Sequence, residues 1–328
     1  MSGATKKLGS IAVAVLALLA GAAVWLTAAA AAAPAEKRSV PGACPDRDPL
    51  APDELRADVS YLASGALGGR APGSSGDAAA MKLIAARFRC LGLEPAGERG
   101  SYFQRFRTSE GDRTASVIGL LPGSDPKLAD HPIVLGAHHD HLGTEGGQTF
   151  HGANDNASGV AGLLAVAAEL SSREQPLRRP VIFASFGGEE TTESAPYLEG
   201  SVRFVRKPPL GLRASDIDFM VNLDMIGTYR NRGLAYVLGP QKGDPGFAQI
   251  HAANHGPDRV RLRYPGALDT DGMSDHWPFA RRGIPTAFFW TPDVRCYHRP
   301  CDVPRRLDFE PMSRITGVVA GSIERLAG

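Results

Sequence analysis

The sequence carries almost no net charge and little cysteine. It has 36 lysine and arginine residues against 35 aspartate and glutamate residues, so it lacks the basic excess typical of a nucleic-acid-binding protein. Only four cysteines are present and no two are spaced as CxxC, which argues against a zinc ribbon or a thioredoxin-like site. Disorder is excluded because 43% of the residues are hydrophobic and only 22% are charged.

Acidic residues are missing from the first 35 positions. Lys6 and Lys7 precede the uncharged, alanine-rich residues 11–33, a run long enough to cross a bilayer, which takes about 20 residues. We predict that residues 1–35 are a secretory signal peptide cleaved before Glu36, or an N-terminal membrane anchor if they are retained. The protein is therefore expected to be exported, secreted or periplasmic, and to contact a membrane only through this segment. Removing it takes away two positive charges and leaves a formal charge of −1.

An exported protein with an even number of cysteines is expected to form disulfides. The four cysteines allow three pairings. A bond between Cys296 and Cys301 closes a short loop, and it leaves Cys44 to pair with Cys90.

The rest of the chain is expected to form one domain. We predict that residues 36–50, rich in proline and charge, are a linker and that residues 51–328 are the domain, since no repeat and no later boundary is apparent. Helices are expected over residues 51–63, 77–91, 157–170, 196–205, 246–254, 274–282 and 310–326. Strands are expected over residues 115–121, 132–137, 181–186, 219–224, 234–238, 260–264 and 285–290. Several strands are continuously apolar, which predicts a three-layer α/β/α sandwich with helices on both faces of the sheet.

Five clusters of histidine, aspartate and glutamate occur, most of them where an expected strand ends, the edge at which an open α/β sheet binds its ligands. The first is AHHDHLG, residues 137–143, in which His138 and Asp140 share a face of an extended segment. A metal-bound imidazole commonly has a carboxylate on its other nitrogen, so His138 is a candidate ligand and Asp140 its orienting partner. A polar strand end is the alternative.

Two further clusters supply carboxylates. In GANDNASG, Asp155 could cap the following helix, but Asn156 or Ser158 could do so equally well and leave Asp155 free. In FGGEE, Glu189 and Glu190 come directly after an apolar strand. Adjacent carboxylates can divide roles, one binding metal and one moving a proton, although a pair of surface glutamates is the alternative.

The last two clusters each contribute one candidate ligand. Asp224 interrupts the apolar strand that contains NLDMIG, and burying a carboxylate is so costly that it needs a cation or several donors as partners. His298 lies between Cys296 and Cys301 in CYHRPCD. A surface loop closed by a disulfide is the alternative interpretation there.

These motifs together resemble those of the secreted di-zinc aminopeptidases, often called the aminopeptidase S/Y family. The matching segments span about residues 52–320 and are YLASGALGGRAPGSSG, AHHDHLG, GANDNASG, FGGEE, NLDMIG, SDHWPF followed by GIP, and YHRPCD. The resemblance implies a zinc exopeptidase of the phosphorylase/hydrolase-like type, with a central mixed sheet. By position it implies two zinc ions, one bound by His138, Asp155 and Asp224 and the other by Asp155, Glu190 and His298.

The resemblance also implies roles for residues that bind no metal. Glu189 is the implied general base, Asp140 the partner of His138, and Tyr297 a residue that helps to stabilise the oxyanion. Two zinc ions about 3.5–4 Å apart polarise a scissile carbonyl and activate a water, whose proton Glu189 can carry to the leaving amine. A ligand set of nitrogen and oxygen without thiolate suits a catalytic zinc. The implied substrates are peptides with a free N-terminus.

Other functions share parts of this pattern. A glutaminyl cyclase would perform a single-zinc acyl transfer on the same fold, and the complete two-metal ligand set argues against it. A carboxypeptidase or dipeptidase would share the zinc and the general base. A binding domain without catalysis is expected to have lost ligands, and none of the five is missing.

Two features near the implied site stand apart from the ligand set. The histidines at positions 139, 141 and 151 are expected to form hydrogen bonds beside the site, and His276 to be structural or to lie at its rim. Residues 191–199 make the loop after Glu190 longer than is usual in the family, and this loop is expected at the mouth of the site.

Overall fold

The computed structural model describes residue 44 and residues 48–190, 198–257, 259–265 and 272–328. In this part of the chain nine strands form one sheet in the order β1-β3-β7-β4-β8-β11-β9-β10, with β2 also paired to β3. Their bounds are β1 Glu94–Pro95, β2 Phe103–Arg107, β3 Arg113–Leu121, β4 Ile133–His138, β7 Val181–Phe186, β8 Phe219–Leu223, β9 Ala235–Leu238, β10 Leu262–Arg263 and β11 Thr286–Trp290. The sheet is mixed, since β4 is parallel to β7 and β8 whereas β3 is antiparallel to β7.

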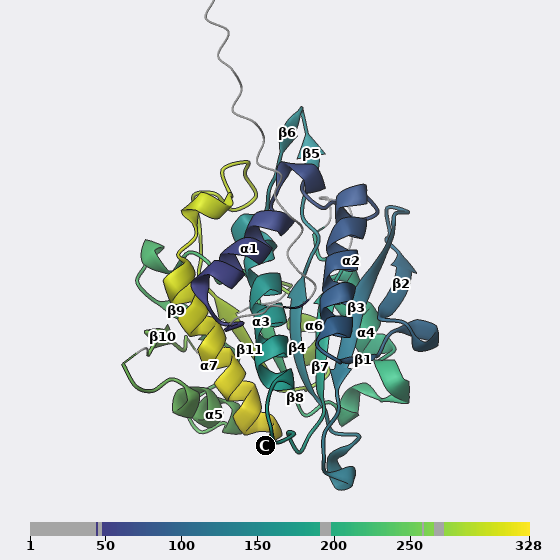
Figure 1. Cartoon of the computed structure of the whole chain (residues 1–328), viewed down its shortest axis with the longest axis vertical. Helices are drawn as coiled ribbons and strands as arrows, with labels where there is room; N and C mark the ends of the chain where they lie inside the picture. Colours follow the sequence, from purple (N-terminus) through teal and green to yellow (C-terminus); the bar gives the residue numbers. More distant parts are fainter. Residues whose placement is uncertain (1–43, 45–47, 191–197, 258, 266–271) are drawn as a thin grey trace, which may run out of the picture. The chain divides into compact units, whose positions relative to one another are not determined.

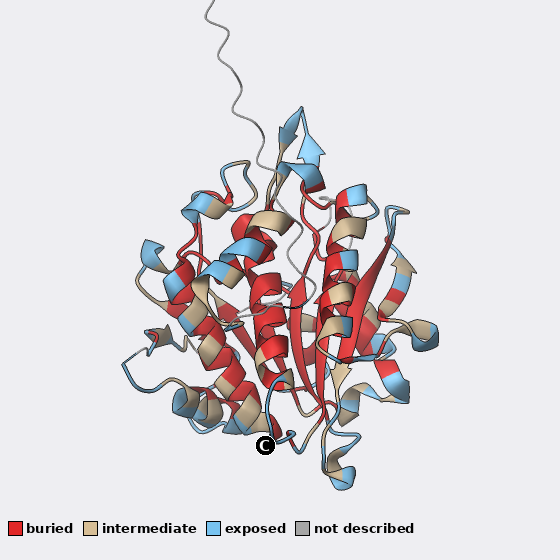
Figure 2. Cartoon of the chain, in the orientation of Figure 1, coloured by how far each residue is buried: buried red, intermediate tan, exposed pale blue. Residues whose placement is uncertain are grey.

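Helices cover both faces of the sheet (Figure 1). One face packs against α1 Pro52–Leu62, α2 Ser75–Cys90, α3 Gly159–Ser171, α5 Pro245–Ala253 and α7 Phe309–Ala327, and the other against α4 Glu199–Arg206 and α6 Trp277–Ala280. The apolar residues alternate accordingly: Phe183 of β7 joins the cluster on the α3 side, and Ile182 joins Phe204 of α4 on the opposite side. Figure 2 shows the central strands and the inner sides of the helices as buried. The predicted three-layer α/β/α sandwich is confirmed.

The elements differ from the predicted ones in a few places. The helix expected over residues 274–282 is limited to α6, because Pro278 has no N–H and fits only a first turn, and Gly283 follows with a φ of 75°. Helix α3 begins at Gly159, since Ala153–Ser158 form an irregular turn before it. The strand expected over residues 260–264 is reduced to β10, and the pattern does not predict the edge strand β2.

Two disulfides are present, as expected, and of the three possible pairings the structure has the one with the short loop. Cys44 is bonded to Cys90 at the end of α2, and Cys296 to Cys301 in the loop after β11. The predicted signal peptide and most of the linker lie outside the described residues. Among the residues that the structure describes, no helix is both long and apolar enough to cross a membrane.

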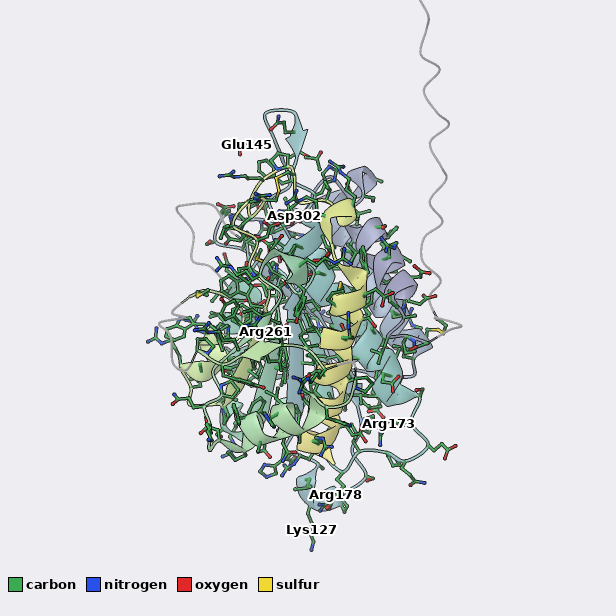
Figure 3. The ribbon with its side chains drawn as sticks, turned by 90° about the vertical axis from the view of Figure 1, so that its left-hand side faces the viewer. Lys127, Glu145, Arg173, Arg178, Arg261 and Asp302 are labelled. Carbon is green, nitrogen blue, oxygen red and sulfur yellow. A yellow bond between two sulfur atoms is a disulfide. The ribbon has the colours of Figure 1, made fainter. Side chains whose placement is uncertain are left out.

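A small hairpin extends the chain beyond the carboxyl end of β4. It consists of β5 Thr144–Glu145 and β6 Gln148–Thr149, paired antiparallel. Figure 3 labels Glu145 on this hairpin, at the same end of the sheet as Asp302. The segments that follow the parallel strands therefore gather at this end.

Candidate metal centre

The predicted site residues converge at the carboxyl edge of the sheet. Strands β7, β4 and β8 are parallel neighbours, so the segments that follow them meet at one edge. His138 is the last residue of β4, and Asp224 directly follows β8. Glu189 and Glu190 follow β7 after two glycines. The topology therefore places four of the chemically active side chains together.

Asp155 lies between two histidines. Its Oδ1 is 3.4 Å from Nε2 of His138, and its Oδ2 is 3.3 Å from Nε2 of His298. On one side Asp224 Oδ1 is 3.5 Å from His138 Nε2, and on the other Glu190 Oε2 is 3.1 Å from His298 Nε2. The five candidate ligands thus form two groups that share Asp155, one carboxylate oxygen facing each group.

These distances fit a pair of bound zinc ions. Donor atoms around a tetrahedral zinc lie about 3.3 Å apart, given metal–ligand bonds of about 2.0–2.2 Å. Within the described part of the chain, Nε2 of His138 and Oδ1 of Asp224 are buried without a hydrogen-bond partner. Buried polar atoms are nearly always paired, so orphaned atoms that face one another indicate a site for a cation.

The electrostatics of the cluster point the same way. Burial disfavours the charge on His138, but the carboxylates of Glu189 and Asp224 outweigh it and raise its pKa well above the ordinary value. Burial likewise opposes the charge on His298, while Asp155 and Glu190 raise its pKa to about 10. The carboxylates therefore attract protons onto both imidazoles when no metal is bound. Metal binding displaces those protons, so the affinity for metal is expected to fall at lower pH.

The contact of Asp140 differs from the one predicted from the sequence. The nitrogen Nδ1 of His138 lies 3.3 Å from the main-chain carbonyl of Asp140, whereas the carboxylate of Asp140 accepts hydrogen bonds from the N–H groups of Glu189 and Glu190, at 3.2 and 3.0 Å. The prediction that the Asp140 carboxylate orients His138 is therefore corrected. β4 ends at His138, so the two-residue alternation of an extended strand does not continue to Asp140.

The site opens into a cavity of about 470 Å³. Its described lining comprises Asp155, Glu189, Glu190, Asp224, Met225, Gly272, Met273, Phe288, Trp290, Pro292, Asp293, Val294, Tyr297 and His298.

Tyr297 stacks on His298 with ring centroids 3.8 Å apart. Burial and the surrounding carboxylates raise the pKa of Tyr297 above its ordinary value, so its hydroxyl keeps its proton and can donate it in a hydrogen bond.

Glu189 lines this cavity beside the ligand pairs. Its Oε2 is 3.9 Å from Nε2 of His138. Burial raises the pKa of Glu189 well above its ordinary value; His138 opposes that shift, and the negative charges of Glu190 and Asp275 add to it. A buried carboxylate with a raised proton affinity is suited to accept a proton and release it again.

Sequence reasoning missed two residues that hold the segments of the candidate ligands. Asp302 accepts hydrogen bonds from the main-chain N–H groups of Asn154 and Asp155, at 2.8 and 3.0 Å. The side chain of Arg70 is completely buried and donates to the carbonyl oxygens of Leu62, His139, His151 and Gly152. Asp302 belongs to the motif YHRPCD and Arg70 to GGRAPG. The resemblance of these motifs to the family was the only indication of either residue in the sequence.

Two residues of SDHWPF were also missed. Ser274 donates a 2.7 Å hydrogen bond to Oδ2 of Asp224, which leaves Oδ1 of Asp224 facing His138. Asp275 is fully buried, and burial raises its pKa to about 7. Only His276 of this motif was considered from the sequence; it is buried and stacks on Phe288, which agrees with a structural position.

The histidines at positions 139, 141 and 151 form polar contacts beside the site, as predicted. His139 is buried between Ser185, at 3.0 Å, and Asp77, at 3.1 Å. His151 contacts the carbonyl of Ala63, and His141 lies 3.0 Å from Oε1 of Glu190. Oδ1 of Asn156 accepts a hydrogen bond from the N–H of Gly159, the first residue of α3, so Asp155 is not the residue that pairs with this N–H group. Residues 191–197 of the longer loop lie outside the described residues.

The fold matches that of solved α/β structures. BSAP, a zinc aminopeptidase from Bacillus subtilis, superposes with a TM-score of 0.67 at 17% identity, covering 84% of this chain and 95% of that one. The glutaminyl cyclase of Porphyromonas gingivalis superposes with a TM-score of 0.66 at 20% identity, covering 85% of this chain and all of that one. At these identities the likeness is one of fold.

The sequence defines the family. Residues 116–323 match the model of Peptidase family M28, and the chain belongs to this family. It is 28% identical over 320 residues to leupeptin-inactivating enzyme 1 of Streptomyces exfoliatus, covering 90% of this chain and 65% of that protein. It is 28% identical over 221 residues to aminopeptidase YwaD of Bacillus subtilis, covering 63% and 44% respectively. The chain thus spans less than two thirds of the length of these curated relatives.

Proposed function

We propose that this protein is a zinc-dependent aminopeptidase that removes N-terminal residues from peptides outside the cytoplasm. The observation that carries the proposal is the pair of ligand groups sharing Asp155, next to Glu189 and open to the cavity of about 470 Å³. Membership of peptidase family M28 and the similarity to a protein named aminopeptidase YwaD support it.

In this proposal two zinc ions bind per chain. His138, Asp155 and Asp224 hold one, and Asp155, Glu190 and His298 hold the other. Zinc bound in these groups supplies Lewis acidity that polarises the scissile carbonyl and lowers the pKa of a water. The absence of cysteine among the ligands fits a catalytic zinc rather than a structural one.

The chain's own residues move the protons and position the substrate. Glu189 takes the proton of the attacking water and gives it to the leaving amine. Tyr297, still protonated, donates a hydrogen bond to the carbonyl oxygen as that oxygen gains negative charge. Asp140 holds the main chain of Glu189 and Glu190 through their N–H groups, which fixes the base relative to the ligands.

The charges on the cavity wall favour the N-terminus over the C-terminus of a peptide. Among its described lining residues five are aspartate or glutamate, and none is lysine or arginine. Four of these acids are the proposed zinc ligands Asp155, Glu190 and Asp224 and the proposed base Glu189, so with zinc bound their charges are largely compensated. The described wall offers no guanidinium or ammonium group to pair with a C-terminal carboxylate. This argues for an aminopeptidase rather than a carboxypeptidase.

The apolar side of the cavity suggests the side chain that the first substrate residue carries. Met225, Met273, Phe288, Trp290 and Val294 form this side. Burial of an apolar side chain against them is favourable, at about 25 cal/mol per Å² of apolar surface. We expect leucine, methionine and phenylalanine in the first position to be preferred over aspartate or lysine.

A panel of aminoacyl amides tests the proposed function. We expect leucine and phenylalanine amides to be hydrolysed, their N-acetylated forms to be inert, and a chelator to abolish the activity until zinc is returned. Released amino acid is measured by chromatography. Shortening of N-acetylated peptides from the C-terminus would instead indicate a carboxypeptidase.

Glutaminyl cyclase activity is the second candidate, because the fold also matches that of a glutaminyl cyclase. A peptide starting with glutamine distinguishes the two. An aminopeptidase releases glutamine, whereas a cyclase releases ammonia and leaves a pyroglutamyl peptide. The paired ligand groups around Asp155 favour the first outcome.

The location outside the cytoplasm rests on two features. The predicted signal peptide or anchor of residues 1–35 would direct export. The two disulfides are typical of proteins in an oxidising compartment. If the leader is retained, the enzyme would be attached to a membrane by it.

The disulfide between Cys296 and Cys301 encloses Tyr297 and His298, so its loss should weaken the site. We expect the double variant Cys296→Ser, Cys301→Ser to lose about tenfold or more in kcat/KM, comparable to other residues that orient a ligand. The matched control is Cys44→Ser, Cys90→Ser, which opens the other disulfide and should retain its kcat/KM. Equal kcat/KM in the two double variants would show that the loop keeps its shape without the bond.

A further inference from the structure

His141 is a third imidazole in the site, and it lies at the second ligand group beside His298. Its side chain is completely buried, and its Nδ1 lies 3.0 Å from Oε1 of Glu190 and 3.9 Å from Oδ2 of Asp155. Its ring centroid is 6.0 Å from that of His298. His141, Asp155 and Glu190 can present ligand atoms within 4.8 Å of one another, so His141 is either a metal ligand or a residue that holds one.

The distances separate these two roles. His298 Nε2 is 3.1 Å from Glu190 Oε2 and 3.3 Å from Asp155 Oδ2, close to the separation of about 3.3 Å between donors on a tetrahedral zinc. The Nδ1 atom of His141 is close to the carboxylate of Glu190 and farther from that of Asp155. The 3.0 Å contact has the length of an ordinary N–H···O hydrogen bond, and the 3.9 Å contact exceeds the separation of about 3.3 Å between donors on a tetrahedral zinc.

The ring of His141 is fixed by the chain around it. The main-chain N–H of His141 donates to the carbonyl of Arg70, and the Arg70 side chain donates to the carbonyl of Gly152. A side chain at position 152 would meet Cγ and Cδ2 of His141 at 2.6 Å, so only glycine leaves room for the ring. The segment that carries Asp155 therefore packs closely against the imidazole at Gly152.

The surroundings also select the tautomer. Within the described residues, Nε2 of His141 is buried and has no hydrogen-bond partner. An unpaired N–H there would be more costly than a bare nitrogen, and the carboxylate oxygen at Nδ1 requires a donor. The proton therefore belongs on Nδ1, where it points at Oε1 of Glu190.

We propose that His141 is a positioning residue for the second metal ion: its Nδ1–H holds Oε1 of Glu190 and so fixes this carboxylate, whose two oxygens lie 3.2 and 3.1 Å from Nε2 of His298. The proposal rests on the proposed two-metal function. It gives each residue of HHDH a separate task, since His138 joins the first ligand group, His139 pairs with Asp77 and Asp140 holds the main chain of Glu189 and Glu190.

The test is a zinc titration of the purified, chelator-stripped chain against a competing chromophoric chelator. We expect His141→Phe to weaken the second equivalent of zinc by about 10–100-fold and to leave the first unchanged. His141→Asn, whose amide N–H can replace Nδ1–H, should bind the second zinc within a few-fold of the unmodified chain. His141→Gln, which places its amide near the position of Nε2, should not restore it. His151→Phe is the matched control and should bind both ions normally.

Cobalt(II) distinguishes positioning from ligation. At saturation the visible absorption spectrum of His141→Asn with two equivalents of cobalt should match that of the unmodified chain, because the ligands are the same. A changed spectrum at saturation would make His141 a direct ligand and overturn the proposal. So would an unchanged second zinc affinity in His141→Phe, or an equal loss in His141→Asn and His141→Gln; this last comparison stands even if His141→Phe does not fold. Failure of the two-metal function itself would appear separately, as a missing second equivalent in the unmodified chain.

Discussion

Replacing Glu189 with glutamine should lower kcat by about 10²–10⁴-fold while both metal ions stay bound. Glutamine keeps the size of the side chain but cannot accept the proton of the attacking water. Glu189 is not one of the five proposed zinc ligands, so the affinity for zinc should change little. The measurement is kcat on leucine amide together with the zinc content of the same sample.

The control for this variant is Glu145→Gln, an exposed acid on the β5–β6 hairpin, which should behave as the unmodified enzyme. Loss of activity in Glu189→Gln accompanied by loss of zinc would make Glu189 a ligand rather than a base. Near-normal hydrolysis would remove it from the mechanism.

Replacing Asp155 with alanine should cost at least one metal ion and nearly all activity. Its two carboxylate oxygens face different groups, Oδ1 toward His138 at 3.4 Å and Oδ2 toward His298 at 3.3 Å. Each zinc therefore loses a ligand when the side chain is removed. The measurement is zinc bound per chain after dialysis at a fixed free zinc concentration.

The matched comparison is with ligands that belong to one group. Asp224→Ala should weaken only the first zinc, and Glu190→Ala only the second, so each should retain one ion under conditions in which Asp155→Ala loses affinity at both sites. Normal retention of two zinc ions by Asp155→Ala would refute the shared-ligand arrangement.

The fold could be predicted from the sequence where burial dictates the residue types. Strands β4, β7 and β8 are buried on both faces and read as continuous apolar runs, which only a covered sheet permits. Strand β2 could not be predicted, because it lies at an edge and its five residues mix half-buried phenylalanine with exposed arginine and show no clear apolar alternation. Helix α6 was predicted too long because its apolar spacing continues past what Pro278 and Gly283 allow.

The site could be predicted where its residues fall at strand ends. His138, Asp224 and the Glu189–Glu190 pair are marked by carboxylates and imidazoles directly after apolar strands, and the parallel pairing then brings them together. The residues that hold these segments in place, Asp302 and Arg70, do not follow an apolar strand and show no comparable pattern in the sequence. Asp302 binds the N–H of Asn154 from 148 positions away, and Arg70 reaches carbonyls up to 82 positions away. Such contacts exist only once the chain is folded.

The atoms used by Asp140 illustrate the same limit. Sequence spacing places its side chain on the same face as His138, which is correct only while the chain remains extended. The strand ends at His138, and the carboxylate turns instead to the two N–H groups after β7. Asp140 still belongs to the site, but it contacts the main chain of Glu189 and Glu190.

The central claim is that two zinc ions sharing Asp155 form one catalytic unit. The most direct measurement is the rate of leucine amide hydrolysis by chelator-stripped protein as zinc is added in fractions of an equivalent. Activity that reaches its maximum only at two equivalents per chain is the predicted result. Full activity at one equivalent, or cyclisation of an N-terminal glutamine as the main reaction, would contradict it.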